Sequence, residues 1–185
     1  MKNLRYLLLI LVFSCGCDPD YSPKPFGYFR IDTPEKEYQR LSENCPYSFE
    51  YNTSAKLKSK NNCWFDIRYP DLKATLQLTY REVSENNLDT LLQEGHDLAY
   101  NHTVRADGID ERLFQNKESK VYGLMYSLKG DVATSLQFYM TDSTNHFLRG
   151  VLYYYASPNA DSLQPANQFM EGELVHLIET LKWEI

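Results

Sequence analysis

Cysteine, glycine and proline are scarce in this sequence, which has 4 Cys, 8 Gly and 8 Pro among 185 residues. Four cysteines are too few for a miniprotein held together by disulfides, and the composition excludes a collagen-like repeat. Basic residues do not predominate, because 19 Lys and Arg stand against 25 Asp and Glu and give a formal net charge of −6. This balance argues against a general nucleic-acid binder, which needs clustered Lys and Arg.

Apolar and aromatic residues are abundant by contrast. Hydrophobic residues make up 43% of the chain, which contains 15 Tyr and 9 Phe. That proportion excludes a disordered tail and a coiled coil. A chain of this length usually folds as one domain. The composition therefore predicts one acidic, aromatic-rich globular domain and says nothing about its activity.

The first residues have the layout of an export signal. A short positively charged start precedes an apolar run over residues 6–13, which is too short to span a bilayer. The run leads into Ser14-Cys15-Gly16-Cys17, which resembles the bacterial lipobox, whose Cys is acylated and becomes the mature N-terminus. We expect a signal peptide over 1–14 and attachment through lipid, because no later segment is apolar enough to span a membrane. An ordinary secretory signal is the alternative.

Two cysteines compete for the lipid. Cys15 directly follows the apolar run and is our prediction. Cys17 is the alternative, because lipid on Cys15 would leave Cys17 as an odd thiol. Residues 15–26 include three prolines, which oppose helix and sheet alike, so we expect a lipidated start and an extended tether there. Residues 27–185 then form a single globular domain.

Alternation of apolar and polar residues predicts strands over most of this domain. The last strand is apolar or aromatic on both faces, so we expect it to be central, with a layer covering each side. A polar stretch near residue 110 predicts only a weak strand. The predicted strands cover residues 63–69, 73–80, 109–114, 121–128, 134–140 and 146–155.

Helical spacing predicts two helices. Residues 88–99 carry one apolar stripe, with Ser84 or Asn86 placed to cap it and Gly95 allowing close backbone packing. A second helix is expected after Pro165, which suits a first helical turn. The sequence therefore predicts an α+β domain, with an antiparallel sheet of about six strands and two main helices packed on it.

Cys45 and Cys63 are predicted to form a disulfide if the chain is exported. The bridge would close a loop of 17 intervening residues and contribute about 3 kcal/mol. Two buried, reduced thiols are the alternative. Neither Cys is near a His in the sequence, so we expect no metal site.

No catalytic motif is present. The four His are His96, His102, His146 and His176, and each is interpreted as a surface or strand-edge residue rather than a ligand. The sequence lacks H-E-x-x-H, G-x-S-x-G, a P-loop and G-x-G-x-x-G. We therefore expect neither an enzyme nor a bound cofactor.

Clustered aromatic residues allow two interpretations. Tyr and Phe at residues 28–29, 47–51 and 153–155 either pack within the sheet, which favours such residues, or form a contact surface, where Tyr is enriched. We favour packing. The contact surface predicts an alternative function, namely an envelope lipoprotein that binds or hydrolyses carbohydrate or peptidoglycan.

Several blocks of sequence occur in a familiar order. They are Lys24-Pro-Phe-Gly-Tyr-Phe-Arg-Ile31, residues 45–51, 63–70 and 136–153, and the ending at 177–183. Together they resemble the gliding motility lipoprotein GldD family over nearly the whole mature chain. The most specific block is 141–153.

The resemblance implies a Bacteroidetes envelope lipoprotein that gliding requires and that is linked to type IX secretion. It implies no enzymatic activity; the protein would bind or stabilise other gliding lipoproteins and envelope proteins. It would be lipid-anchored and face the periplasm, in the outer membrane in preference to the inner one. We expect its working surface on one sheet face or on the loops around 141–145 and 157–164. The order of elements also resembles the PsbP/Mog1-like α/β/α sandwich, a likeness of fold that carries no function.

Bacteroidetes O-glycosylation uses Asp-Ser or Asp-Thr followed by an aliphatic residue or Thr. The candidate acceptors are Thr90, Ser143 and Ser162. Asp142 and Asp161 are predicted to lie in turns, where a sugar can be accommodated. Structural turn and cap roles for these Asp-Ser pairs are the alternative.

Overall fold

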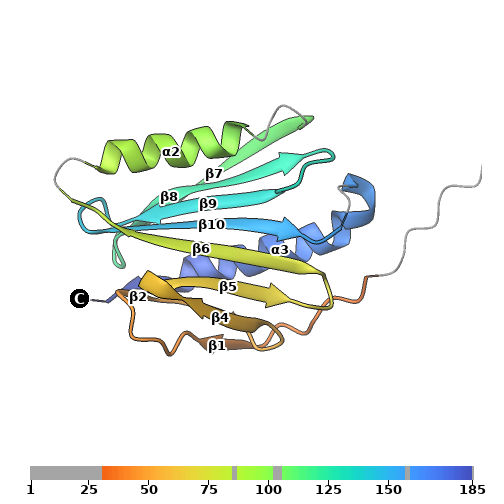
Figure 1. The fold of residues 1–185 in the computed structure, drawn as a ribbon, viewed down its shortest axis with the longest axis horizontal. Helices are drawn as coiled ribbons and strands as arrows, with labels where there is room; N and C mark the ends of the chain where they lie inside the picture. The colour runs from red at the N-terminus through yellow and green to blue at the C-terminus, as the bar shows by residue number, and fades with distance from the viewer. Residues whose placement is uncertain (1–30, 85–86, 102–105, 157–158, 185) are drawn as a thin grey trace, which may run out of the picture.

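The computed structural model describes residues 31–84, 87–101, 106–156 and 159–184. Its centre is a seven-stranded antiparallel sheet with the order β4-β5-β6-β10-β9-β8-β7 (Figure 1). The fold is α+β, as predicted, with seven strands in the main sheet rather than about six. The strands are β4 (Lys56–Lys60), β5 (Trp64–Tyr69), β6 (Ala74–Glu82), β7 (Gly108–Asn116), β8 (Val121–Lys129), β9 (Leu136–Thr141) and β10 (His146–Tyr154).

The strand that the sequence analysis missed is β4. Lys56, Lys58 and Lys60 are exposed and alternate with Leu57 and Ser59, so the segment has a single apolar residue. Lys is depleted in strands, and one leucine does not make a recognisable apolar face. The segment is nevertheless a strand because it pairs with β5 along its whole length.

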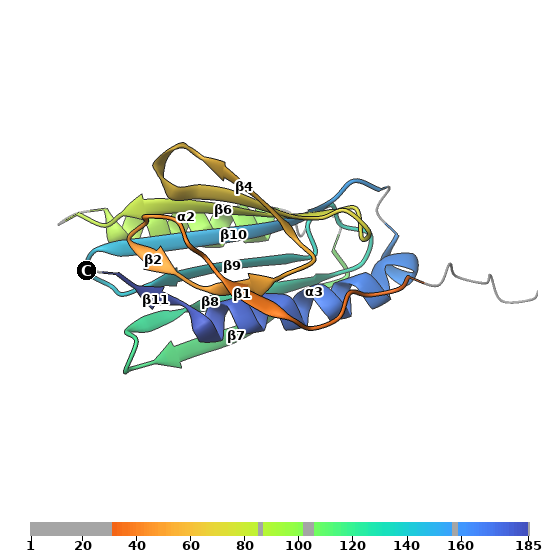
Figure 2. The same ribbon diagram turned by 90° about the horizontal axis from the view of Figure 1, so that it is seen from below.

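The two helices cover opposite faces of the sheet (Figures 1 and 2). On one face, α2 (Leu88–Tyr100) packs against Tyr139 and Phe147. On the other, α3 (Ala160–Thr180) covers the main core, which includes Phe138 and Met140. Neighbouring residues of β9 point to opposite faces, so one strand supplies both layers. The layers are α/β/α, while the likeness to the PsbP/Mog1 fold stays a prediction.

Strand β10 is central, as predicted from its apolar character. It is fourth in the order of seven and pairs with β6 and β9. Leu148 and Leu152 are both fully buried on the α3 side, while Phe147 is buried on the α2 side. A strand covered on both faces must be apolar on both, which explains its sequence.

Helix α2 begins later than the cap prediction required. Its N-cap is Asn87, so the choice of Ser84 or Asn86 was wrong; Asn86 lies outside the described residues. The Asn87 side chain accepts from the Ser84 N–H at 2.9 Å and thus binds the preceding turn rather than the helix. The prediction for Gly95 is confirmed, because a Cβ there would stand 3.2 Å from the Tyr139 ring.

Helix α3 begins earlier than predicted. Its N-cap is Asn159, whose side chain accepts from the Ser162 N–H at 2.9 Å. The Ala160 N–H donates to Asp131 at 2.7 Å, which satisfies a second free amide of the helix start. Pro165 therefore lies inside α3, in its second turn, and the prediction that it opens the helix was wrong.

Short strands attach the N-terminal part of the domain to α3. Strand β1 (Tyr38–Arg40) pairs with β3 (Glu50–Asn52), and β2 (Tyr47–Ser48) pairs with β11 (Lys182–Trp183). The short helix η1 (Asn61–Cys63) then leads into β5. In Figure 2, β1 lies next to α3. Neither described helix is long and apolar enough to cross a membrane.

The Glu173 carboxylate is buried under these N-terminal strands, 4% exposed. It accepts hydrogen bonds from the hydroxyls of Tyr38, at 3.1 Å, and Tyr69, at 3.4 Å. Burial raises the pKa of Glu173, while these hydrogen bonds oppose the rise. The carboxylate thus joins β1 and β5 to α3.

Candidate functional site

The turn between β9 and β10 is rigid because one carboxylate organises it. Asp142 accepts from the backbone N–H groups of Thr144, Asn145 and His146 at 2.8–2.9 Å and from the Thr144 hydroxyl at 2.7 Å. The Thr141 hydroxyl donates to the His146 carbonyl at 2.6 Å. Ser143 has a φ of 68°, a left-handed conformation that needs such support in a residue with a side chain.

These contacts change the acidity of Asp142. Partial burial alone raises the pKa of this carboxyl, but the hydrogen bonds from Thr144, Asn145 and His146 outweigh it and lower the pKa to about 2. Hydrogen bonds donated to a carboxylate favour its charged form. Asp142 therefore stays ionised and keeps the turn in place at any pH well above 2.

We expect Asp142→Ala to lower the free energy of unfolding by about 1–2 kcal/mol at pH 6, because amides of the turn lose their acceptor. The pKa of Asp142 is lower in the folded chain than its ordinary 3.8, so its contribution is present above pH 4 and lost as the pH falls towards 2. Solvent screening limits this pH-dependent part to about 1 kcal/mol. Urea unfolding of variant and wild type at pH 6, 4 and 2 measures the difference.

Asp71→Ala, at an exposed turn residue before β6, is the matched control and should change stability by less than about 0.5 kcal/mol. A difference between Asp142→Ala and wild type that is as large at pH 2 as at pH 6 would contradict the assignment.

A stack of aromatic side chains packs against the turn at its His146 end. The His146 ring lies parallel to the Trp183 ring, with centroids 5.1 Å apart, and its Nδ1 is hydrogen-bonded to the Tyr80 hydroxyl at 2.8 Å. Tyr80 stacks in turn on Tyr47, whose hydroxyl donates to the Cys63 carbonyl. The stack therefore joins the turn to β2, β6, β11 and the end of η1.

A hollow of about 570 Å³ opens beside this turn. Part of its wall is formed by the stacked rings of His146 and Trp183, and exposed side chains such as Lys120 and Lys182 form its rim. Cations and carboxylates are balanced around it, which suits a polar peptide surface better than a highly charged ligand. The lining residues are Glu118, Ser119, Lys120, Asp142, Thr144, Asn145, His146, Lys182 and Trp183.

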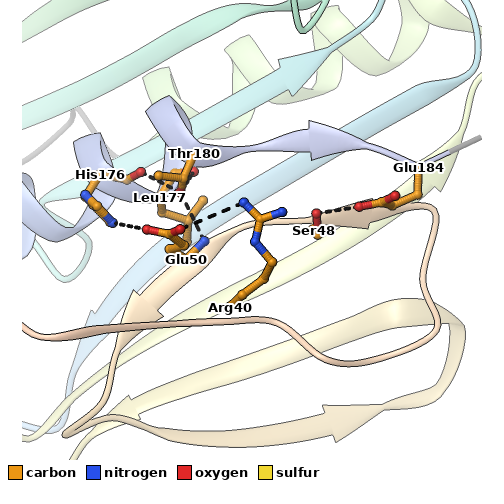
Figure 3. Close-up of polar contacts among 7 residues, drawn as sticks. All are labelled: Arg40, Ser48, Glu50, His176, Leu177, Thr180 and Glu184. Carbon is orange, nitrogen blue, oxygen red and sulfur yellow. Dashed lines mark hydrogen bonds and ion pairs between the residues drawn. The ribbon is translucent and has the colours of Figure 1, made fainter.

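A second polar cluster lies where β3 meets the end of α3 (Figure 3). His176 Nε2 is 3.0 Å from Glu50 Oε2, and the Glu50 N–H donates to Thr180 Oγ1 at 3.0 Å. The Ser48 hydroxyl instead donates to Glu184, at 2.6 Å. A serine nucleophile must donate to its His base, and here the two are held by different carboxylates. The cluster therefore fastens strands to the helix and does not form a Ser–His pair.

The predicted His positions are now placed, except for His102, which lies outside the described residues. His96 is exposed on α2 and stacks on Tyr100, with centroids 4.3 Å apart. His146 and His176 lie in the separate clusters described above. Within the described ranges, no group of three or more His, Cys, Asp or Glu is arranged to hold a metal ion.

The candidate modification sites differ in exposure. Thr90 is exposed in the first turns of α2, and Ser143 is exposed in the β9–β10 turn. Ser162 is half-buried in α3, so the prediction that Asp161 lies in a turn was wrong; the Asn159 cap extends the helix through it. Cys15 and Cys17, the alternative lipid sites, lie outside the described residues.

Cys45 and Cys63 form a disulfide in the structure. It joins the residues just before β2 to η1, next to the Tyr47 contact with the Cys63 carbonyl. Tyr47 and Phe49 are fully buried, so packing is confirmed for these two aromatics, whereas Tyr155 is 68% exposed. Tyr28 and Phe29 lie outside the described residues.

Sequence reasoning chose the 141–145 loop but missed what surrounds it. Lys120, from the β7–β8 turn, and Trp183, from the C-terminal strand, lie far from this loop in the sequence. Both meet it because β9 is between β8 and β10 and because β11 returns to β2. The consecutive turn-forming residues Asp142, Ser143 and Thr144 were the sequence feature that indicated this loop.

A comparison with protein families confirms the family that the sequence blocks indicated. A family model described as "Gliding motility lipoprotein GldD" matches residues 18–183. The chain belongs to the GldD family. The match covers every described strand and helix, including the turn at 141–146 and Trp183. No curated protein matches the chain.

Membership in the GldD family makes this chain a gliding motility lipoprotein of the cell envelope, anchored by lipid. The family description names no substrate and no partner. The described part of the chain presents a turn held by hydrogen bonds, a stacked pair of rings and a hollow beside them.

Proposed function

We propose that this GldD-family lipoprotein is a non-enzymatic component of the gliding and type IX secretion machinery, and that it binds or stabilises other envelope proteins of that machinery. The hollow at the β9–β10 turn is the contact site in this proposal. It faces the periplasm on a lipid-anchored protein, in the outer membrane in preference to the inner.

The observation that carries the proposal is the rigidity of this hollow. Asp142 fixes the turn through several hydrogen bonds, and the His146–Trp183 stack fixes the wall. A preformed surface binds without the entropic cost of ordering flexible loops, which favours recognition of a protein partner. The same turn belongs to the sequence block that most resembles the family.

The test is a crosslinking pull-down with the tagged, full-length lipoprotein in its own membranes, read by mass spectrometry. Wild type should enrich other gliding or type IX components. Asn145→Arg, which places a long cation at the rim of the hollow and keeps every hydrogen bond to Asp142, should reduce that recovery by about tenfold, equivalent to about 1.4 kcal/mol of binding energy.

Thr53→Arg is the matched control. Thr53 is also exposed, but it lies just before the Lys56 end of β4, at the opposite end of the sheet from the turn. The control should recover partners as wild type does, and both variants should unfold at wild-type urea concentrations. Peptidoglycan fragments in place of machinery proteins would overturn the proposal and favour the carbohydrate-binding alternative.

A further inference from the structure

Strand β7 forms an unprotected edge of the sheet. It pairs with β8 in unbroken register, from Gly108↔Lys129 to Asn116↔Val121. Within the described ranges no strand pairs with its other side, because the sheet order ends at β7. Alternate backbone N–H and C=O groups of an edge strand point outward and can accept another strand.

The opposite edge of the sheet shows how this chain protects a strand. Strand β4 has five residues and carries exposed Lys56, Lys58 and Lys60, a pattern that repels an added strand. Strand β7 has nine residues, contains no proline and presents Leu113 at 64% exposure. One edge is therefore a short strand with charges of a single sign, whereas the other is longer and its exposed charges, Asp110, Glu111 and Arg112, are of mixed sign.

A groove runs between β7 and α3, on the face opposite α2. Two hollows mark it. One, of about 440 Å³, lies between Asp110 and Arg112 of β7 and the first half of α3, including Gln164. The other, of about 470 Å³, lies between Phe114 and the end of α3 at Ile178. Figure 2 shows α3 running along the sheet beside β7. An added strand would thus have room for the side chains that it points towards α3.

Carboxylates outnumber cations along this groove. Among the cations, Lys129 pairs with Asp110 at 2.6 Å, and the Arg112 guanidinium lies 4.9 Å from the centre of the Phe114 ring. The acidic lining therefore favours a basic occupant. The acids are Asp110, Glu118, Asp161, Glu171 and Glu179, whereas the Glu111 carboxylate accepts from Tyr100 of α2 on the other face. The cations are Arg112, Lys117 and Lys129.

We propose that an extended, basic segment of a partner protein adds to β7 as an eighth strand, with alternate Lys or Arg side chains in the groove towards α3. Main-chain hydrogen bonds supply the affinity of such an addition, and pockets for alternate side chains supply its specificity. The inference rests on the proposed function, since it names a second surface and the chemistry of a partner.

The direct test places a photocrosslinking amino acid at residue 113 or 115 of the full-length lipoprotein in its own cells. Both positions are exposed and lie on the same face of β7. Strand addition predicts that moving the probe by two residues moves the crosslinked partner residue by two along one segment. That segment should carry Lys or Arg at alternate positions.

Charge and edge variants test the same geometry. Leu113→Lys places an exposed lysine on the edge strand, as in β4, and should reduce the crosslink yield from residue 115 by about tenfold. Tyr155→Lys is the control, at a similarly exposed side chain away from β7, and should leave that yield unchanged. Glu171→Lys reverses a charge in the groove and should weaken the crosslink, while Glu94→Lys on α2 should leave it unchanged. Circular dichroism confirms that each variant is folded.

Other occupants would overturn the inference. Crosslinks to β7 of a second copy would show a homodimer edge, and crosslinks to residues 18–30 of the same chain would show that its own segment covers the strand. Equal crosslinking in Leu113→Lys and wild type would also overturn it. If the wild-type pull-down recovers machinery proteins and β7 variants leave that recovery unchanged, this inference fails while the proposed function stands.

Discussion

Gly123→Ala should destabilise the domain by about 3–5 kcal/mol, enough to unfold most of the population of a marginally stable protein. Gly123 is the third residue of β8, and a Cβ there would stand 1.9 Å from the Tyr139 carbonyl oxygen. That oxygen belongs to the backbone of β9, so no side-chain rotation relieves the clash and the two strands must separate. The loss of free energy follows from urea unfolding monitored by circular dichroism.

Gly108→Ala is the matched control. Gly108 is also in a strand, and a Cβ there would meet nothing within 4 Å. We expect a change within about 0.5 kcal/mol. Equal unfolding midpoints for the two variants would show that β8 and β9 can move apart freely, and the close approach at Gly123 would then have no structural role.

Replacing both Cys45 and Cys63 with alanine should lower the free energy of unfolding by about 3 kcal/mol, because the unfolded chain is no longer closed into a loop. The two cysteines are 18 positions apart and both adjoin the Tyr47–Tyr80–His146–Trp183 stack. We also expect Trp183 fluorescence to change at lower urea in the variant, because the stack loses its covalent support.

Reduced wild-type protein provides the comparison for this variant. A reductant should shift the unfolding midpoint of wild type to that of the double alanine variant and leave the variant itself unmoved. A reductant without effect on wild type would mean that the two sulfurs are not bonded in the exported protein.

The strands that were predicted correctly are those with a clear periodic pattern. Apolar and polar residues alternate strictly over residues 73–80. Strand β6 (Ala74–Glu82) covers most of this segment, and one of its faces is buried under α3. Strand β10 was placed at the centre because both of its faces are apolar. A buried strand face requires apolar residues, so the positions of β6 and β10 can be predicted from their own segments of sequence.

The parts that were missed depend on partners distant in sequence. Lys56–Lys60 looks polar and is a strand only because β5 pairs with it. Residues 109–114 looked weak because most side chains of β7 are exposed, yet β8 holds nine of its residues in register. The start of α3 was misplaced because proline at the first turn was preferred over the better cap at Asn159.

The candidate site was predictable in part for the same reason. The Asp-Ser-Thr-Asn run at 142–145 predicts a turn, because such side chains form hydrogen bonds with nearby backbone groups. The hollow beside it depends on Lys120 and Trp183, which no local pattern connects to that turn. The groove along β7 was likewise invisible, because a free edge is defined by the absence of a neighbouring strand.

The pairing of β2 with β11 imposes an order of events on the exported chain. Tyr47 is fully buried and contacts the Trp183 ring edge-on. The Ser48 hydroxyl donates a hydrogen bond to Glu184, which lies 136 positions later in the sequence. Until the last helix and strand have been translocated, Tyr47 lacks its contact with Trp183, and contacts this distant in sequence form slowly. The packing of Tyr47 therefore cannot be completed before the last residues of the chain have been exported.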